Sequence, residues 1–339
     1  MNRILLSAPN NDAWCFGTYL EAALSNIGAD VHLFDFRSVK DANRALLDIA
    51  AHYRPKLHII WKGERLTPTT LRKLRSVGVL NVLWYPDGDI PEWLVPLAQA
   101  SDLCCTQGSL MRDRLRQLGV GRVERLLEGI TPECFHYDSM TANEQQEYAC
   151  DVVTIGTIDR HPRYRRRLHA LNRLLREGIH VKWWGKKLSF SQNSLRDSFS
   201  PARRAWGRRG VRGPEFAKAC HGAKIFLAIP YRPERPGGLS NRALWVTGVG
   251  SFYLSQYKAG IEEFFEPGKE IAVFEDEQDM INQVRYYLTH PEARAAIAAA
   301  GQRRTLAEYT NQQAFRQLFD MVTRNDSGLA QTINPPLSA

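Results

Sequence analysis

Residues 151–162 read D-V-V-T-I-G-T-I-D-R-H-P, a succession of strand, glycine loop and helix start that decides the fold class. The run Asp151–Ile155 is rich in β-branched side chains, which favour a strand. Gly156 and Thr157 then form a loop, and a basic segment follows from Arg163 to Leu168. A glycine loop before a helix N-terminus binds anions through free N–H groups. The stretch therefore predicts an anion-binding strand–loop–helix unit. Each arginine of the basic segment could equally lie on a solvated helix face.

The same alternation of short apolar runs and helical patterns extends along both halves of the chain. In the first half, strands are predicted at Arg3–Ser7, Val31–Phe34, Leu57–Trp61, Asn81–Tyr85 and Asp102–Cys105. In the second half, they are predicted at Asp151–Ile155, His180–Trp184, Lys224–Ile229, Ser251–Leu254 and Glu270–Phe274. Helical segments between most of these runs predict an α/β protein with two doubly wound parallel sheets.

The boundary between the halves is predicted from a polar, aperiodic segment between about Phe135 and Cys150, which is typical of a linker. We predict an N-terminal domain over residues 1–140 and a C-terminal domain over residues 150–325, which includes a helical tail from about Gln278. Residues 326–339 are predicted to be disordered. Ligands of such sheets bind beyond the carboxyl ends of the strands, so a cleft between the two domains is expected to hold the site.

Composition narrows the class of protein. A hydrophobic content of 44% suits a soluble globular chain, and no apolar run approaches the roughly 20 residues of a membrane-spanning helix. The six cysteines are scattered, which favours neither a zinc site nor a disulfide framework and predicts a reducing, cytoplasmic setting. The net charge of +9 indicates an anionic partner: nucleotide phosphates, nucleic acid or an acidic membrane.

Three further stretches could carry chemistry. Trp184 and Gly185 end a predicted strand, where a flat base could approach the glycine and stack on the indole, although one of Trp183 and Trp184 is expected in the core. Arginines between Ser200 and Gly213, with Trp206 among them, suit either a nucleic acid or plain solvent. Asp87-Gly88-Asp89 could hold a divalent ion, form a turn, or place Asp87 in the cleft. His161 and His221 are expected to be structural, since neither has a partner at a local spacing.

The order of these motifs resembles that of the CgeB/YkvP-like glycosyltransferases, relatives of the retaining family-4 enzymes. The similarity covers most of the chain and is strongest from Gly238 to Thr310. The segments that carry it are Ile59–Glu64, Val82–Asp87, Glu128–Phe135, Ser240–Arg242, Gly250–Phe252, Phe264–Glu270 and Tyr286-Tyr287. The resemblance implies a GT-B fold, in which two Rossmann-like domains face each other across a cleft.

The resemblance also implies a function and a set of site residues. It implies that the protein moves a sugar from a nucleotide diphosphate sugar to an acceptor hydroxyl, with retention and with no metal or other cofactor. Arg242 and Asp87 are the expected catalytic residues. The expected donor-binding residues are Gly156, Thr157, Arg167, Trp184, Gly185, Gly238, Ser240, Asn241, Trp245 and Lys258. The expected acceptor-binding residues are Asn10, Asn11, Asp12 and Trp14.

One departure from the family pattern concerns the donor. The family usually has R-x-F-E where this chain has Arg242-Ala243-Leu244-Trp245, so Trp245 replaces a glutamate expected to hold the ribose. Gly237 replaces an earlier acid of the same pattern. We expect Trp245 to compensate by stacking on the base or sugar, although it could instead turn into the core.

Two other functions stay open. The sequence leaves the acceptor open among a glycan, a small molecule, a protein and a modified nucleic acid. One alternative is therefore a glycosyltransferase that acts on modified nucleic acid bases, which the positive net charge would suit. Alternatively, the chain could be a non-catalytic nucleotide-binding protein on a GT-B scaffold, which the loss of the glutamate at Trp245 favours.

Overall fold

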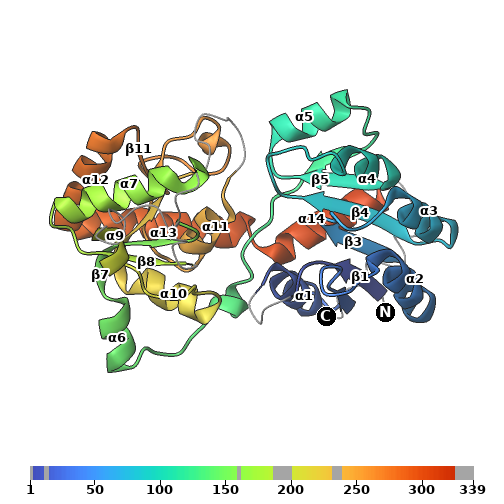
Figure 1. Cartoon of the computed structure of the whole chain (residues 1–339), viewed down its shortest axis with the longest axis horizontal. Helices are drawn as coiled ribbons and strands as arrows, with labels where there is room; N and C mark the ends of the chain where they lie inside the picture. The colour runs from blue at the N-terminus through green and yellow to red at the C-terminus, as the bar shows by residue number, and fades with distance from the viewer. Residues whose placement is uncertain (1–2, 11–14, 159–161, 186–200, 231–238, 325–339) are drawn as a thin grey trace, which may run out of the picture. The chain divides into compact units, whose positions relative to one another are not determined.

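The structure of the protein is a computed structural model that describes residues 3–10, 15–158, 162–185, 201–230 and 239–324 (Figure 1). The chain forms two compact units. The first contains residues up to Thr131 together with the segment from Glu308 onward, and the second contains Pro132–Ala307. Each unit is built on one parallel sheet.

The first unit holds a sheet of strand order β2-β1-β3-β4-β5-β6. Its strands are β1 (Arg3–Ser7), β2 (Asp30–Phe34), β3 (Leu57–Trp61), β4 (Leu80–Tyr85), β5 (Leu103–Thr106) and β6 (Val123–Arg125). Its helices are α1 (Phe16–Asn26), α2 (Ala42–Tyr53), α3 (Pro68–Ser76), α4 (Leu94–Ala100), α5 (Ser109–Gln117) and α14 (Asn311–Thr323). Two apolar clusters fill the two faces: α1 and α14 pack on one, and α2, α3, α4 and α5 on the other.

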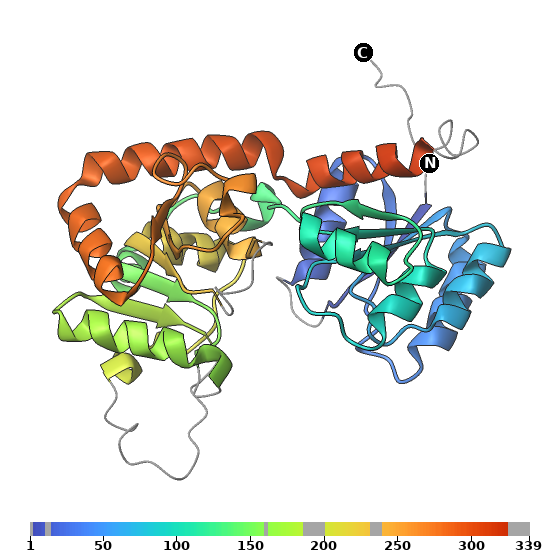
Figure 2. The same ribbon diagram turned by 90° about the horizontal axis from the view of Figure 1, so that it is seen from above.

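The C-terminal helix α14 belongs to the first unit, whereas the sequence places it at the end of the second domain. Figure 2 shows α14 lying along the first unit. Its buried side chains, among them Phe315 and Leu318, join the same apolar cluster as Trp84, whose ring Phe315 contacts edge to face. The backbone around the start of α14 pairs with Ile130, near the end of the first half of the chain. Ile130 N–H donates to Tyr309 O at 3.0 Å, and Asn311 N–H donates to Ile130 O at 2.8 Å. An amphipathic pattern predicts a helix with a buried face, but not which sheet covers that face.

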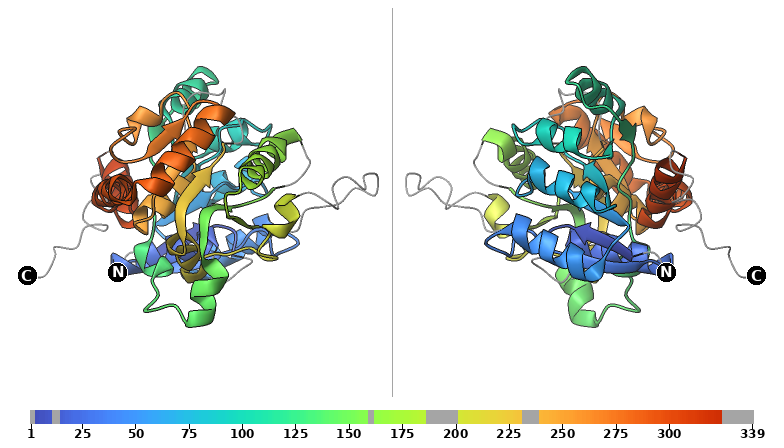
Figure 3. Two further views of the ribbon diagram at one scale, coloured as in Figure 1. Left: turned by 90° about the vertical axis from the view of Figure 1, so that its left-hand side faces the viewer. Right: turned by 90° about the vertical axis from the view of Figure 1, so that its right-hand side faces the viewer.

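The second unit holds a sheet of strand order β11-β10-β9-β7-β8 with helices on both faces (Figure 3). Its strands are β7 (Cys150–Ile155), β8 (Val181–Trp184), β9 (Ala223–Ala228), β10 (Tyr253–Gln256) and β11 (Ala272–Phe274). Its helices are α6 (Ala142–Tyr148), α7 (Pro162–Arg176), α9 (Pro201–Arg204), α10 (Pro214–His221), α11 (Asn241–Gly248), α12 (Glu277–Thr289) and α13 (Pro291–Glu308). Two 3-10 turns, η1 (Pro132–Phe135) and η2 (Ile261–Glu263), complete it. Every strand predicted from the sequence is present within two residues of its expected bounds, and β6 was not predicted.

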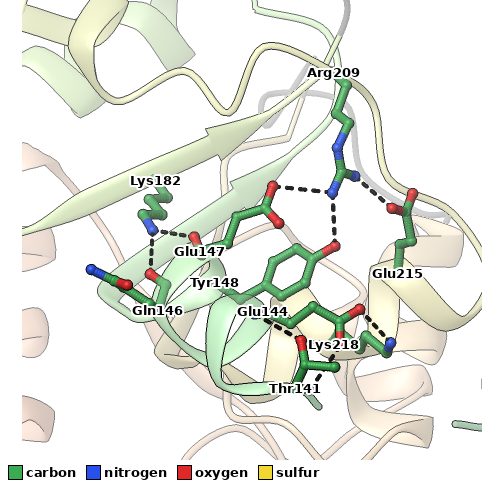
Figure 4. Close-up of polar contacts among 9 residues, drawn as sticks. All are labelled: Thr141, Glu144, Gln146, Glu147, Tyr148, Lys182, Arg209, Glu215 and Lys218. Carbon is green, nitrogen blue, oxygen red and sulfur yellow. Dashed lines mark hydrogen bonds and ion pairs between the residues drawn. The ribbon is translucent and has the colours of Figure 1, made fainter.

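The segment predicted to be a linker is instead part of the second unit. Residues 142–148 form α6, which Thr141 and Glu144 begin with a reciprocal capping box (Figure 4). Tyr148 is buried at the end of this helix, and Lys218 of α10 pairs with Glu144 at 2.6 Å. A polar segment of this kind lacks an apolar stripe, so its anchoring by ion pairs was not visible in the hydrophobic pattern.

A buried polar chain crosses the first sheet. Asn81 donates from its amide nitrogen to the carbonyls of Leu71 and Val79, so its oxygen accepts from His58 Nδ1 at 3.0 Å. His58 Nε2 therefore accepts from the Ser7 hydroxyl at 2.8 Å. This pairing satisfies a neutral imidazole, and burial lowers the pKa of His58 to about 4.

Two properties of the described residues bear on the protein's class. None of the described helices is long and apolar enough to cross a membrane. All six cysteines are buried and carry free thiols.

Candidate functional site

The order of the second sheet reverses at β7, because β8 lies on one side of it and β9 on the other. The carboxyl ends of β7 and β9 are therefore a topological switch point, where ligands of open α/β sheets bind. The loop after β7 begins at Gly156, whose φ of 140° lies in the region that favours glycine. The loop after β9 begins at Ile229.

Arg242, in the first turn of α11, lies against the glycine loop. A Cβ atom on Gly156 would stand 2.9 Å from Arg242 Nη2 and 3.1 Å from its Cζ. The missing side chain at position 156 therefore makes room for the guanidinium. The structure brings together Arg242, predicted to be catalytic, and Gly156, predicted to bind the donor.

Arg167 of α7 ties the two loops of the switch point together. Its Nε donates to Ile229 O and its Nη1 to Thr157 O, both at 3.0 Å. Burial raises the pKa of the Tyr253 phenol, while a hydrogen bond with Ser255 and the charges of Arg242 and Arg167 oppose that rise. Two guanidinium groups thus lie at the switch point, Arg167 on the loop carbonyls and Arg242 against Gly156. Such a pair suits a diphosphate, which arginine binds through charged hydrogen bonds.

The other residues predicted to bind the donor differ in how near they lie to the switch point. Ser240 is the residue before α11 and Asn241 its first residue, so both lie beside Arg242 in the chain. Lys258 follows β10, the neighbour of β9, and its carbonyl accepts from Ile261 N–H at 3.1 Å. Gly238 lies outside the described residues.

The prediction that Trp184 faces a base is wrong. Its side chain is only 1% exposed, a Cβ on Gly207 would meet its ring, and Arg209 lies 5.1 Å from the ring centroid. Gly185 also has a packing role: its N–H donates to Arg209 O, and its carbonyl accepts from Trp206 Nε1. A Cβ there would stand 2.2 Å from Gly156 O. The glycine is required by close backbone packing.

Trp245 packs among aromatic side chains of its own unit. Its ring centroid lies 5.6 Å from that of Phe135 in η1 and 5.7 Å from that of Phe216 in α10. The Phe216 contact is edge to face, a favourable geometry for aromatic pairs. Trp245 thus packs against Phe135 and Phe216 but stays partly exposed, so stacking on a base or sugar remains a prediction.

The order of the first sheet reverses at β1, between β2 and β3. Asn10 follows β1, and its side-chain oxygen accepts from Thr18 Oγ1 at 3.0 Å and from Cys15 Sγ at 3.2 Å. Asn11, Asp12 and Trp14 lie outside the described residues. The loop after β3 adds Lys62, to which the sequence assigned no role.

Lys62 pairs with Asp87, the predicted acceptor-side carboxylate. Its Nζ lies 2.7 Å from Asp87 Oδ2, which joins the loops after β3 and β4. Asp87 is half exposed. Among the described residues, no group of three or more His, Cys, Asp or Glu side chains could hold a metal ion. A carboxylate paired with an ammonium can orient a hydroxyl group and accept its proton.

The basic cluster between Ser200 and Gly213 is divided in its roles. Arg209 is committed to the fold, because it pairs with Glu215 at 2.7 Å, Glu147 at 3.1 Å and the Tyr148 hydroxyl at 3.0 Å (Figure 4). Arg204 and Arg208 are exposed and have no ion-pair partner in the part of the chain that the structure describes. His221 is held by Tyr137 and by the Val249 carbonyl, both at 2.6 Å, whereas His161 lies outside the described residues.

Comparison with known proteins agrees with this architecture. Residues 160–320 match the model of a family described as glycosyl transferase-like. No curated protein matches the sequence.

Several solved structures share the fold at low sequence identity. Sucrose-phosphate synthase from Thermosynechococcus elongatus matches with a TM-score of 0.68 and 12% identity, over 96% of this chain and 100% of that chain. The Anabaena protein HepE, in complex with UDP and glucose, matches with a TM-score of 0.67 and 12% identity over the same shares. A glycosyltransferase from Rickettsia africae matches with a TM-score of 0.67 and 8% identity, over 95% of this chain and 98% of that chain. The prediction of a GT-B fold with two Rossmann-like domains is confirmed.

Proposed function

We propose that this protein is a glycosyltransferase that moves a sugar from a nucleotide diphosphate sugar to an acceptor hydroxyl. The observation that carries the proposal is the meeting of Arg242, Gly156 and Arg167 at the switch point of the second sheet. A match of residues 160–320 to a glycosyl transferase-like family supports the reaction class. HepE, which shares the fold, is in complex with UDP and glucose, which supports a uridine nucleotide as the first donor to test.

The proposed chemistry assigns different tasks to the two units. The bond between the anomeric carbon and the diphosphate oxygen breaks, and its electron pair leaves with the diphosphate. Arg242 stabilises the charge that develops there, with Lys258 as a further cation. The acceptor oxygen bonds to the anomeric carbon and gives up its proton, and Asp87 orients that hydroxyl or accepts the proton. Retention, independence of metal and a cytoplasmic setting belong to the proposal, and the free buried cysteines support the last.

A thermal-shift experiment tests the donor site. Purified protein is melted with UDP, other nucleoside diphosphates and their sugars, with and without a chelator. A ligand at 100 times its Kd stabilises a protein by about 2.7 kcal/mol, which moves the melting temperature by several degrees. We expect a shift with one nucleotide family that the chelator leaves unchanged. Absence of any shift would contradict the proposal, and binding without turnover of any sugar donor would identify a non-catalytic protein.

A nucleic acid is the second candidate acceptor, and one observation favours it. Residues 160–212 contain 16 Lys and Arg residues against 2 Asp and Glu residues. Binding of a fluorescent single-stranded oligonucleotide should then weaken steeply with added salt, because each phosphate contact releases a counterion. The variants Arg204→Glu and Arg208→Glu should reduce that slope, and Arg72→Glu in the first unit should not. Binding that ignores salt would exclude this acceptor.

A further inference from the structure

Lys62 holds a backbone conformation that is unfavourable for its residue type. Its φ is 72°, in the left-handed region, where the Cβ atom comes too close to the following carbonyl oxygen. Among the described residues, only Arg54, Lys62 and Arg208 combine a side chain beyond Cβ with a positive φ. A glycine would adopt this conformation freely, as Gly63 does in the next position with a φ of 93°. The backbone at position 62 therefore favours glycine over lysine.

The conformation is imposed by the neighbouring strand. Lys62 N–H donates to Trp84 O at 3.1 Å, which extends the pairing of β3 and β4 by one residue. Gly63 follows where a Cβ would stand 2.7 Å from an Ile60 methyl group. The chain thus turns sharply away from the sheet at the carboxyl end of β3, and Lys62 is the residue at the turn.

Within the part of the chain that the structure describes, the lysine side chain has a single charged partner. Its Nζ lies 2.7 Å from Asp87 Oδ2 and 4.9 Å from the centroid of the Trp61 ring. No hydrogen bond to the other carboxylate oxygen, Asp87 Oδ1, is found within the described residues. The ammonium therefore fixes one oxygen of a half-exposed carboxylate, and the other oxygen is available to a ligand.

Stability does not explain a lysine at this position. Ion pairs that are open to solvent contribute little to folding, and Asp87 is 50% exposed. Backbone strain of this kind persists mainly where a side chain serves a function. The backbone at Lys62 is strained, and the result of placing a lysine there is an ammonium group beside Asp87.

We propose that Lys62 is a positioning residue that holds the Asp87 carboxylate in place to receive the acceptor hydroxyl. This inference rests on the proposed glycosyl transfer and extends it to a residue of the first unit. It predicts that a glycine at position 62 relaxes the backbone and yet impairs turnover. A lysine retained for stability would give the opposite result.

The test uses the full-length protein and a matched pair of variants. Lys62→Gly and Arg54→Gly each remove a side chain from a left-handed residue of the same unit, and Arg54 ends α2 with no side-chain partner in the described part of the chain. Asp87→Asn removes the carboxylate charge, and Lys62→Arg restores a cation. For each protein, three quantities are measured: the melting temperature, its shift with UDP, and the kcat and KM for UDP release from UDP-glucose with water as acceptor.

We expect Lys62→Gly to melt within about 2 °C of Arg54→Gly and to keep the full shift with UDP. Its kcat should fall at least tenfold, a change comparable to that of Asp87→Asn, with an unchanged KM for UDP-glucose. Arg54→Gly should keep the wild-type kcat, and Lys62→Arg should recover part of it.

Two results would overturn the inference: a wild-type kcat in Lys62→Gly, or a melting temperature for this variant several degrees below that of Arg54→Gly. Failure of the proposed function itself has a different signature. In that case the wild-type protein shows no shift with any nucleoside diphosphate or no turnover of any nucleotide sugar, before any variant is compared.

Discussion

The two sheets place opposite chemistry at equivalent points. At the switch point of the second sheet, the side chains of Arg242 and Arg167 meet a glycine and backbone oxygens. At the carboxyl edge of the first sheet, Lys62 meets the carboxylate of Asp87. An arrangement of cations suits a diphosphate, whereas a paired carboxylate suits a neutral hydroxyl and its proton. Under the proposed function, one fold repeated twice would provide an anion site in one unit and a hydroxyl site in the other.

The largest expected effect is the loss of the guanidinium at the anion site. Arg242→Ala should lower turnover of UDP-glucose by about 100-fold or more, because one preorganised group on developing charge contributes on that scale. The shift in melting temperature with UDP should also disappear. An Arg242→Ala variant that keeps both the shift with UDP and the turnover would contradict the assignment of the anion site to the second unit.

Acid should act on the first unit through His58. Its pKa is about 4 in the folded protein against 6.5 for a free histidine, so the unfolded chain takes up the proton first as pH falls. The stabilisation by neutral His58 is complete above pH 6.5 and is lost progressively between pH 6.5 and 4. The loss amounts to about 3 kcal/mol.

Urea unfolding of the wild-type protein between pH 7 and 4 measures this loss, with His58→Gln as the comparison. The variant should be less stable at pH 7 and should depend less on pH over this window. An identical pH dependence in the variant would exclude His58 as its source. Exposed His52→Gln serves as the control and should follow the wild-type curve.

A methyl group on the glycine loop should displace Arg242. Gly156→Ala places a Cβ 2.9 Å from the guanidinium, and we expect an affinity for UDP lower by about tenfold, the loss of one charged hydrogen bond. Gly178→Ala is the matched control, since Gly178 also has a positive φ but has open space around its Cα. Both variants should lose stability, and titration with UDP should separate them. Equal affinities would show that the guanidinium does not depend on the glycine.

The smallest expected effect on the donor concerns Trp245. Because its ring packs against Phe135 and Phe216, Trp245→Ala should cost about 1–2 kcal/mol of stability. Its affinity for UDP should stay within about threefold of the wild type, less than one hydrogen bond is worth. Thermal unfolding and a UDP titration measure the two quantities. A large loss of affinity with little loss of stability would mean that the indole contacts the nucleotide after all.

Local patterns were sufficient for the elements and for part of the anion site. Alternating apolar runs predicted the strands of both sheets, and glycine and helix-start signals placed Gly156 and Arg242 at the carboxyl edge of the second. These features are readable because side-chain periodicity and glycine conformations act over a few neighbouring residues. Their order along the chain predicted two doubly wound sheets, and the family resemblance implied the GT-B fold.

Tertiary structure decided which partner each side chain meets. The helix pattern of α14 and the polar pattern of α6 did not reveal their sheets or ion pairs, and Trp184 and Gly185 were assigned to a ligand although packing occupies them. Lys62 and Asp87 are 25 positions apart and meet only because parallel strands place the ends of β3 and β4 side by side. Sequence by itself determined the elements and their order, since those depend on local interactions. The choice between packing and function at each residue was made by contacts between distant segments.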